Sequence, residues 1–236
     1  MNVLVRAERT PAYASSIHSG RTALGELCLY VSSNASVQQA RLECIKVLLD
    51  AGASPNAHTE FNEPPLIHAA IGHDVAIVNM LLAAGADPRY ASSRHGGWSA
   101  IHAAAAWDSC ACATALLKAG ADVEGLYRNT AISFPITPLM QAVYSGHRRI
   151  IPVLLRGGAR LDMTGIAALP GAHYSLAQEG AVPSYIAKVN AAGGWKKYEQ
   201  AHRTRLTTTF TRVLFPRLPI AAISNIVCSW AHVGFY

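Results

Sequence analysis

The stretch TPLMQAVYSGHRRIIPVLLRGGA, residues 137–159, predicts two short helices joined by a tight turn. Thr137 can cap the first helix, and Pro138 suits its first position because the amide there has no partner within a helix. That helix ends at Gly146, and a second, apolar helix closes on Gly157–Gly158, where glycine can adopt a left-handed conformation. Two helices this short cannot bury an apolar side alone, so similar units must stack beside them.

Two further copies of the unit precede this stretch. The spans Pro64–Gly85, Ser99–Gly120 and Thr137–Gly158 each cover 21 positions from helix start to closing glycine (85−64, 120−99, 158−137). The segments between units differ in length, at 12, 14 and 17 positions (64−52, 99−85, 137−120). The helical hairpin is therefore the fixed unit, and exposed loops that tolerate insertion connect successive hairpins.

This pattern resembles the ankyrin repeat, with its Thr-Pro-Leu-His start, paired alanines, Gly-His turn and Leu-Leu-x-x-Gly-Ala-Asp close. The resemblance covers residues 22–193. It implies an all-α ankyrin-repeat solenoid of about five stacked helix-turn-helix units, of which the first and last are degenerate. We expect residues 194–236 to form a basic helical tail that caps the array.

Residues 1–21 precede the first unit. Arg6 and Arg9 suggest an organelle transit peptide, whereas Glu8 and Pro11 argue against one, and we expect a poorly ordered extension. No secretory leader is apparent, so we expect a cytoplasmic chain, with the nucleus as the alternative.

The two end units depart from the pattern. Thr22–Gly52 covers 30 positions, nine more than the standard 21. We place the excess around Val31–Ser36, whose turn-forming composition would lengthen the loop between the helices. The last unit, Gly171–Gly193, begins loosely at His173 and closes with a thin apolar side made by Tyr185, Ile186 and Val189.

Proline and histidine mark further departures. Pro152 lies within the second helix of the fourth unit, so we expect that helix to start late or to bend. His73 stands where the turn glycine belongs, which predicts a turn shifted by one residue. His102 occupies the histidine position of the repeat, where the resemblance implies local bonding across the helix start. His147 follows Gly146 as in the Gly-His turn.

The five cysteines are an odd number without secretory context, so we expect free thiols in a reducing compartment. Cys44 and Cys112 fall eight positions before the closing glycines, at a core position (52−44, 120−112), and Cys28 takes the place of the second alanine. A metal site of His102, Cys110 and Cys112 would need Cys112 to leave the core, so we expect no metal.

No catalytic motif is present: the chain lacks a nucleophile elbow, a phosphate-binding loop and a paired-histidine zinc helix. We therefore expect no enzymatic activity, no cofactor and no small-molecule substrate. The expected function is binding of another protein by a monomeric chain.

The resemblance implies a concave groove lined by residues that differ between repeats. Aromatic side chains there are typical binding anchors, although Trp98 could instead cover the loop of the next unit. The expected groove residues are Glu63, Trp98, Trp107, Ile136, Tyr144 and Ser145, with a rim of Tyr90, Arg94, His95, Tyr127 and Arg128 at the loop tips.

The tail holds six of the 20 basic residues and one of the 14 acidic ones. Three interpretations compete. It can be a helical cap. It can attract nucleic acid or an anionic membrane through Lys196, Lys197, Arg203 and Arg205, which we consider the weakest. It also resembles the SOCS-type or F-box-like (PRANC) elements that recruit ubiquitin ligase components, with candidate residues Leu206, Phe210, Leu218, Pro219, Ile223 and Val227.

Overall fold

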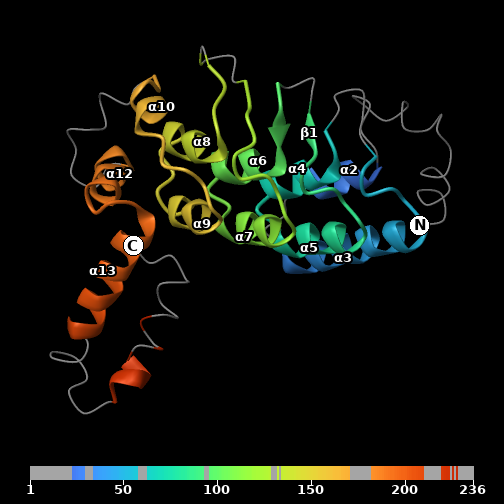
Figure 1. Ribbon diagram of the computed structural model, residues 1–236. Helices are drawn as coiled ribbons and strands as arrows, with labels where there is room; N and C mark the ends of the chain where they lie inside the picture. The colour runs from blue at the N-terminus through green and yellow to red at the C-terminus, as the bar shows by residue number, and fades with distance from the viewer. Residues whose placement is uncertain are drawn as a thin grey trace.

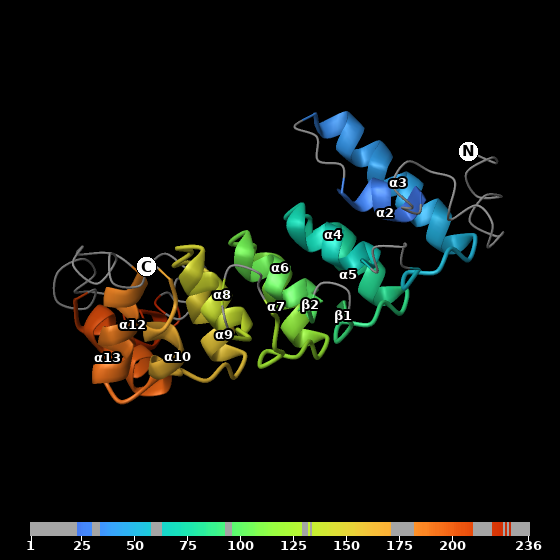
Figure 2. The same cartoon turned by 90° about the horizontal axis from the view of Figure 1, so that it is seen from above.

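The computed structural model describes residues 23–29, 34–57, 63–92, 96–128, 132, 134–170, 182–209, 219–223, 225 and 227. Its helices lie in two layers that run side by side along the molecule, and Figure 2 shows them following one another in a single row. The first layer holds α2 (Ala23–Leu29), α4 (Pro65–Ile71), α6 (Ala100–Ala106) and α8 (Pro138–Tyr144). The second layer holds α3 (Ala35–Asp50), α5 (Val75–Ala83), α7 (Cys110–Lys118) and α9 (Ile151–Arg156).

Loops rise from the first layer, as Figure 1 shows. Strands β1 (Ala91–Ser92) and β2 (Trp98–Ser99) pair antiparallel in one of them. In the next loop Tyr127 and Ile136 form a bridge through two backbone hydrogen bonds, of 2.9 and 2.8 Å. These hairpins sit just before α6 and α8, so they fix where the loop residues lie relative to the first layer.

The ends of the helices confirm the local predictions. The Thr137 hydroxyl accepts a hydrogen bond from the Met140 amide at 3.3 Å, and Pro138 occupies the first turn of α8. The hairpins close on glycines in the left-handed region, with φ of 90° at Gly85 and 92° at Gly120. A side chain there would be strained, which explains why glycine recurs at this position.

The turn between the two helices of a unit does not shift where glycine is missing. His73 and Asp108 have φ of 57° and 54°, and Gly146, at the same position of its unit, has φ of 77°. The expected one-residue shift at His73 is therefore wrong. The helices on either side fix the turn geometry, and a non-glycine residue accepts the left-handed conformation at a modest cost.

The core runs between the two layers. Ile77, Cys112 and Ile150, which share one position in their units, are all fully buried, as is Cys28. Cys44 has the same position in the first unit but is only half-buried, so it is not the core residue we expected. No described unit precedes the first one, so this side of α3 has no neighbouring unit within the described part of the chain. The described cysteines are free thiols.

Most of the nine extra positions of the first unit lie in its second helix. Helix α3 has 16 residues and α5 has nine, so seven of the nine extra positions lengthen the helix. The loop that we expected to hold them, between α2 and α3, takes only the remaining two. Asn34 caps α3 by accepting a hydrogen bond from the Ser36 amide at 3.0 Å, which starts this helix early.

The fourth unit confirms the effect of Pro152. Helix α9 starts at Ile151, with this proline in its first turn, and has six residues where α7 has nine. Proline needs no amide partner in a first turn, so the helix begins there instead of bending around it.

Beyond α9 the regular spacing ends. Helix α10 (Met163–Ala167) packs against α8 in the first layer, and no sequence pattern predicted it. The expected start of the last unit at Gly171 and His173 lies outside the described residues. In α12 (Val182–Ala191) the predicted apolar side is buried: Tyr185 is 4% exposed, and Ile186 and Val189 are fully buried.

Polar side chains link neighbouring units at the start of the loops. Asn56 and Arg89 lie four positions after their closing glycines, and each donates a hydrogen bond of 2.9 Å to the carbonyl of the next unit's closing glycine. Glu124, at the same position, accepts a hydrogen bond from the Arg160 amide at 2.8 Å. These bonds hold the spacing of the units. No helix in the described part of the chain is long and apolar enough to cross a membrane.

Candidate protein-binding surface

Trp107 and Tyr144 are large aromatic side chains that the stacked layers leave exposed. Trp107 is the residue that ends α6, and Tyr144 is the last residue of α8. Their exposed fractions are 46% and 38%, and α6 packs directly against α8. The two rings therefore lie at the same end of neighbouring helices. We call Trp107, Tyr144 and the half-buried Ser145 the aromatic surface.

Trp98 belongs to a different environment, at the loop end of the same unit. Its ring lies 4.6 Å from that of Tyr127, edge to face, and 5.9 Å from that of His102, measured between centroids. Tyr127 comes from the loop of the next unit. Trp98 thus covers that loop, as the alternative interpretation of this residue predicted. This side chain therefore packs against the next unit.

His102 is a buried structural residue. Its Nδ1 is 2.8 Å from the Ser99 hydroxyl and its Nε2 is 3.1 Å from the Gly125 carbonyl oxygen. Burial lowers the pKa of His102 to about 4, so the ring is neutral at physiological pH. With both nitrogens occupied, the ring links the helix start to the next loop, which confirms the local bonding that was predicted.

His102, Cys110 and Cys112, the metal site that the sequence analysis argued against, lie in separate environments. Cys112 is fully buried, and both ring nitrogens of His102 have hydrogen-bond partners. Among the residues that the structure describes, no three His, Cys, Asp or Glu side chains are arranged to hold a metal ion.

Two of the expected groove residues contact the interior of the array instead of lining a groove. Ile136 is fully buried and pairs with Tyr127 through the backbone, so it cannot contact a partner. It directly precedes the α8 cap, where we expected an exposed position, but it belongs to the buried core. The Glu63 carboxylate lies 3.0 Å from the buried Nε2 of His68, whose Nδ1 lies 3.3 Å from the Gly25 carbonyl oxygen. Glu63 therefore orients His68 between the first two units.

The loop tips carry a less uniform rim than expected. Tyr90 and Tyr127 are half-buried, and Arg128 is exposed. Arg94 and His95 lie outside the described residues. Leu126, which sequence reasoning missed, is 59% exposed. A Cβ on Gly97 would lie 2.3 Å from the Leu126 carbonyl oxygen, so neighbouring loops pack this closely only because the residue is glycine.

The helices α12 and α13 (Trp195–Thr209) close the far end of the array. The Glu199 carboxylate accepts hydrogen bonds from Arg156 at 2.9 Å and from Arg203 at 2.8 Å. Partial burial works to raise the pKa of Glu199, but the two guanidinium groups outweigh it and hold the pKa below its usual value. The Arg156 guanidinium also lies over the Trp195 ring, 5.5 Å from its centroid. The start of α13 is therefore fastened to α9.

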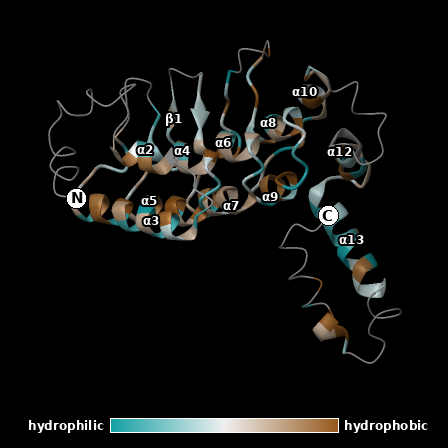
Figure 3. Ribbon diagram, turned by 180° about the vertical axis from the view of Figure 1, so that it is seen from behind, coloured by the Kyte–Doolittle hydropathy of each residue, from teal (hydrophilic) through white to brown (hydrophobic). Residues whose placement is uncertain are grey.

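The rest of the tail is more exposed. Helix α13 carries hydrophilic residues along much of its length, as Figure 3 shows, and Lys196, Lys197 and Arg205 are exposed. Of the candidate recruiting residues, Leu206 is half-buried and Pro219 is exposed, while Phe210 and Leu218 lie outside the described residues. Ile223 and Val227 are buried, but they are not part of the core that runs through the array.

Comparison with known proteins gives the identity of the repeats. A family model described as ankyrin repeats, in three copies, matches residues 33–125. The repeats in this stretch are ankyrin repeats. An ankyrin repeat protein of fowlpox virus (strain NVSL) is 26% identical over 143 residues, which cover 61% of this chain and 31% of that protein. The chain thus spans less than a third of that relative.

Ankyrin repeats generally mediate protein–protein interactions and act without catalysis. The family match ends at residue 125, ahead of the tail, so the resemblance of the tail to recruiting elements stays a prediction. The match does cover Trp98 and Trp107 in the third unit.

Proposed function

We propose that this ankyrin-repeat chain binds a partner protein through the aromatic surface, with Trp107 and Tyr144 as anchors. The observation that carries the proposal is the exposure of both rings at the ends of neighbouring helices that are otherwise buried: all seven residues of α6 and six of the seven residues of α8 are buried, and Tyr144 is the seventh of α8. Exposing a large aromatic ring to water is unfavourable, and such side chains are the commonest anchors of protein interfaces.

The geometry favours a protein segment as the ligand. Trp107 and Tyr144 project from rigid helix ends, so little conformational freedom is lost when a partner covers them. Ser145 adds a hydroxyl, which accepts a hydrogen bond of 3.0 Å from Gln141 and has a proton left to donate. A flat partner surface with an apolar pocket for each ring would match this arrangement.

The proposal is tested by affinity capture from cells that express the chain, followed by quantitative mass spectrometry. We expect Trp107→Ala combined with Tyr144→Ala to reduce capture of the main partner at least about tenfold, since anchor truncations cost about 2 kcal/mol. The matched control is Val37→Ala, which removes an exposed apolar side chain on α3. Equal capture by both variants would overturn the assignment, provided that both melt at the wild-type temperature.

A second candidate function is substrate selection for a cullin-type ubiquitin ligase, with the tail as the recruiting element. Ile223 and Val227 favour it because they pack outside the array core, as expected of a separate element. The test compares the whole chain with one that ends after Thr209, which keeps the Glu199 contacts. Ligase components captured only by the whole chain would support this function, and their absence from both would remove it.

A further inference from the structure

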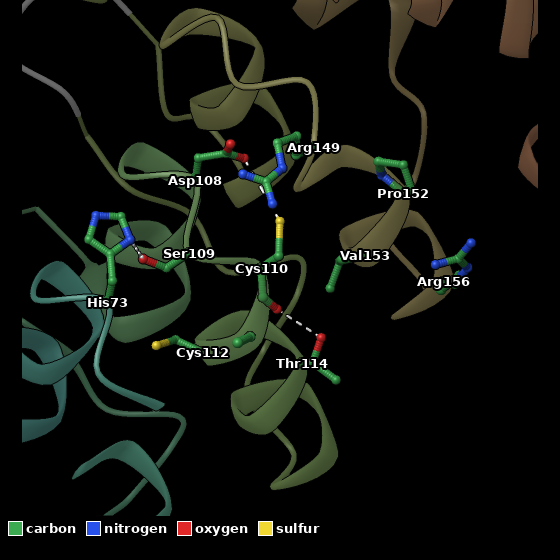
Figure 4. Close-up of a pocket in the computed structure, with 11 residues that line it drawn as sticks. His73, Asp108, Ser109, Cys110, Cys112, Thr114, Arg149, Pro152, Val153 and Arg156 are labelled. Atoms are coloured by element: carbon green, nitrogen blue, oxygen red, sulfur yellow. Dashed lines mark hydrogen bonds between the residues drawn. The ribbon is translucent and has the colours of Figure 1, made fainter. Parts of the chain in front are cut away.

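A groove runs along the seam between α7 and α9, in the second layer (Figure 4). It consists of two adjoining hollows of about 390 and 350 Å³ that share Thr114, Val153 and Arg156. One hollow extends to the turns at Asp108 and the other to Gly157. Together they follow the whole length of the short helix α9.

The groove exists because of the sequence of these two helices. Pro152 makes α9 begin at Ile151, so the first helical turn present in α7 has no counterpart in α9. Across the seam, α7 presents the small side chains of Cys110 and Ala111. A late start on one side and small residues on the other leave the seam open.

The groove has a net positive formal charge, because Arg149, Arg156 and Lys118 line it together with a single acid, Asp108. Arg149 lies exposed at one end and Lys118 at the other, and neither makes a hydrogen bond or ion pair with the described residues. Asp108 lines the same hollow as Arg149 and keeps its negative charge, while its Oδ1 accepts a hydrogen bond of 3.1 Å from the Ile150 amide. Arg156, midway, is held by Glu199.

Apart from Arg156, which is paired with Glu199, the lining between these two cations is uncharged. Val153 and Leu117 line it, and burial, followed by the charge of Asp108, raises the pKa of the Cys110 thiol to about 11. Cys110 thus stays protonated and behaves as a small, weakly polar side chain.

The spacing of the two cations excludes one small anion as the full ligand. Arg149 has the same position in its unit as Ala111, and Lys118 is seven residues further along α7. Seven residues of helix rise about 10 Å along the axis, and Arg149 also lies across the seam from α7, so the two cations are at least this far apart, which is more than one carboxylate spans. An extended chain covers about 10 Å in three residues, so two acidic side chains three or four positions apart would reach both cations.

We propose that this groove is a second docking site, and that it binds an acidic segment of a partner protein. Apolar side chains of the segment lie on the Val153 and Leu117 floor, and its flanking carboxylates pair with Arg149 and Lys118. This site is separate from the aromatic surface, so it stands or falls independently of the proposed function.

The test measures fluorescence anisotropy of labelled octapeptides with a Glu-Leu-Phe-Glu core, titrated with the full chain at low salt. We expect the Arg149→Gln, Lys118→Gln variant to bind about tenfold more weakly, because two exposed ion pairs are lost. The matched control is Lys196→Gln, Lys197→Gln on α13, which removes the same charge from exposed positions and should change binding less than about twofold. Ala111→Trp, which fills the groove without changing charge, should also abolish binding.

Several results would overturn the proposal. A Gln-Leu-Phe-Gln peptide could bind as tightly as the acidic one, or the α13 control could lose as much affinity as the Arg149→Gln, Lys118→Gln variant. The acidic peptide could also fail to bind the wild-type chain. Full displacement of the peptide by an equal concentration of free glutarate would show a small-anion site instead. Self-association of the chain that Arg149→Gln removes would assign the groove to a second copy.

Discussion

The two tryptophans of the third unit, nine residues apart, show how position within a repeat decides the role of a side chain. Trp98 stands at the loop end, where the Tyr127 ring of the next unit lies 4.6 Å away. Trp107 stands at the turn end, where 46% of its surface stays exposed. The next unit therefore covers the aromatic side chain at the loop end, whereas the turn end leaves the Trp107 side chain largely exposed.

The same contrast appears in the histidines of the two ends. His102 at the loop end is fully buried and has hydrogen-bond partners at both nitrogens. His73 at the turn end is exposed and adopts the left-handed conformation of the turn glycine. Stability should thus depend on the loop end and binding on the turn end, and four predictions test this division.

The largest expected effect is on pH-dependent stability. The pKa of His102 is about 4 in the folded chain and 6.5 in the unfolded one, so the unfolded state binds the proton more readily. Stability is then complete above pH 6.5 and falls by about 3 kcal/mol as the pH drops to 4. Urea unfolding at several pH values measures this slope, and in His102→Gln most of it should vanish. A variant that kept the wild-type slope would place the titration elsewhere.

The second prediction concerns the loop-end tryptophan. Trp98→Ala removes the ring contacts with Tyr127 and His102 and should lower the free energy of unfolding by about 2 kcal/mol. Chemical denaturation followed by circular dichroism gives this value. Trp98→Phe, which retains a ring, should recover more than half of the loss. A loss below about 0.5 kcal/mol would contradict the packing role.

The third prediction compares glycines at the two ends. Gly97 and Gly146 both have positive φ, of 96° and 77°, so alanine is strained at each. Only at Gly97 would the new Cβ also collide with a neighbouring loop, whereas nothing lies within 4 Å at Gly146. Gly97→Ala should therefore destabilise by about 1 kcal/mol more than Gly146→Ala. Equal melting temperatures of the two variants would contradict the close packing of the loops.

The smallest effect on stability is expected at the turn end. Trp107→Ala should change the free energy of unfolding by less than about 0.5 kcal/mol, because nearly half of this residue is exposed to solvent. Thermal melting checks this. A large loss would mean that Trp107 packs like Trp98, and the contrast between the two ends would then fail.

The sequence predicted the parts of the fold that repetition encodes. The helix cap at Thr137, the closing glycines and the buried position of Cys112 all follow from the spacing of the units. The late start of α9 followed from Pro152 alone. These features are local or recur in every unit, so aligning the units with one another is enough to predict all of them.

Features that depend on a missing or distant neighbour could not be predicted. Cys44 has a core position, but the first unit has no described neighbour on that side. Ile136 occupies a position that the family pattern leaves variable, yet it is fully buried in the core. Helix α10 has no counterpart in the regular spacing. The groove at Arg149 required the relative positions of two helices from different units.

The division between the two ends is tested most directly by photo-crosslinking. A benzoylphenylalanine replaces Trp107 in one version of the full chain and Val37 in another, and both are irradiated in an extract of cells that express the chain. We predict one dominant protein adduct at position 107, which disappears in Tyr144→Ala, and none at position 37. Equal adducts at both positions, or an adduct at 107 that Tyr144→Ala leaves unchanged, would contradict binding at the aromatic surface.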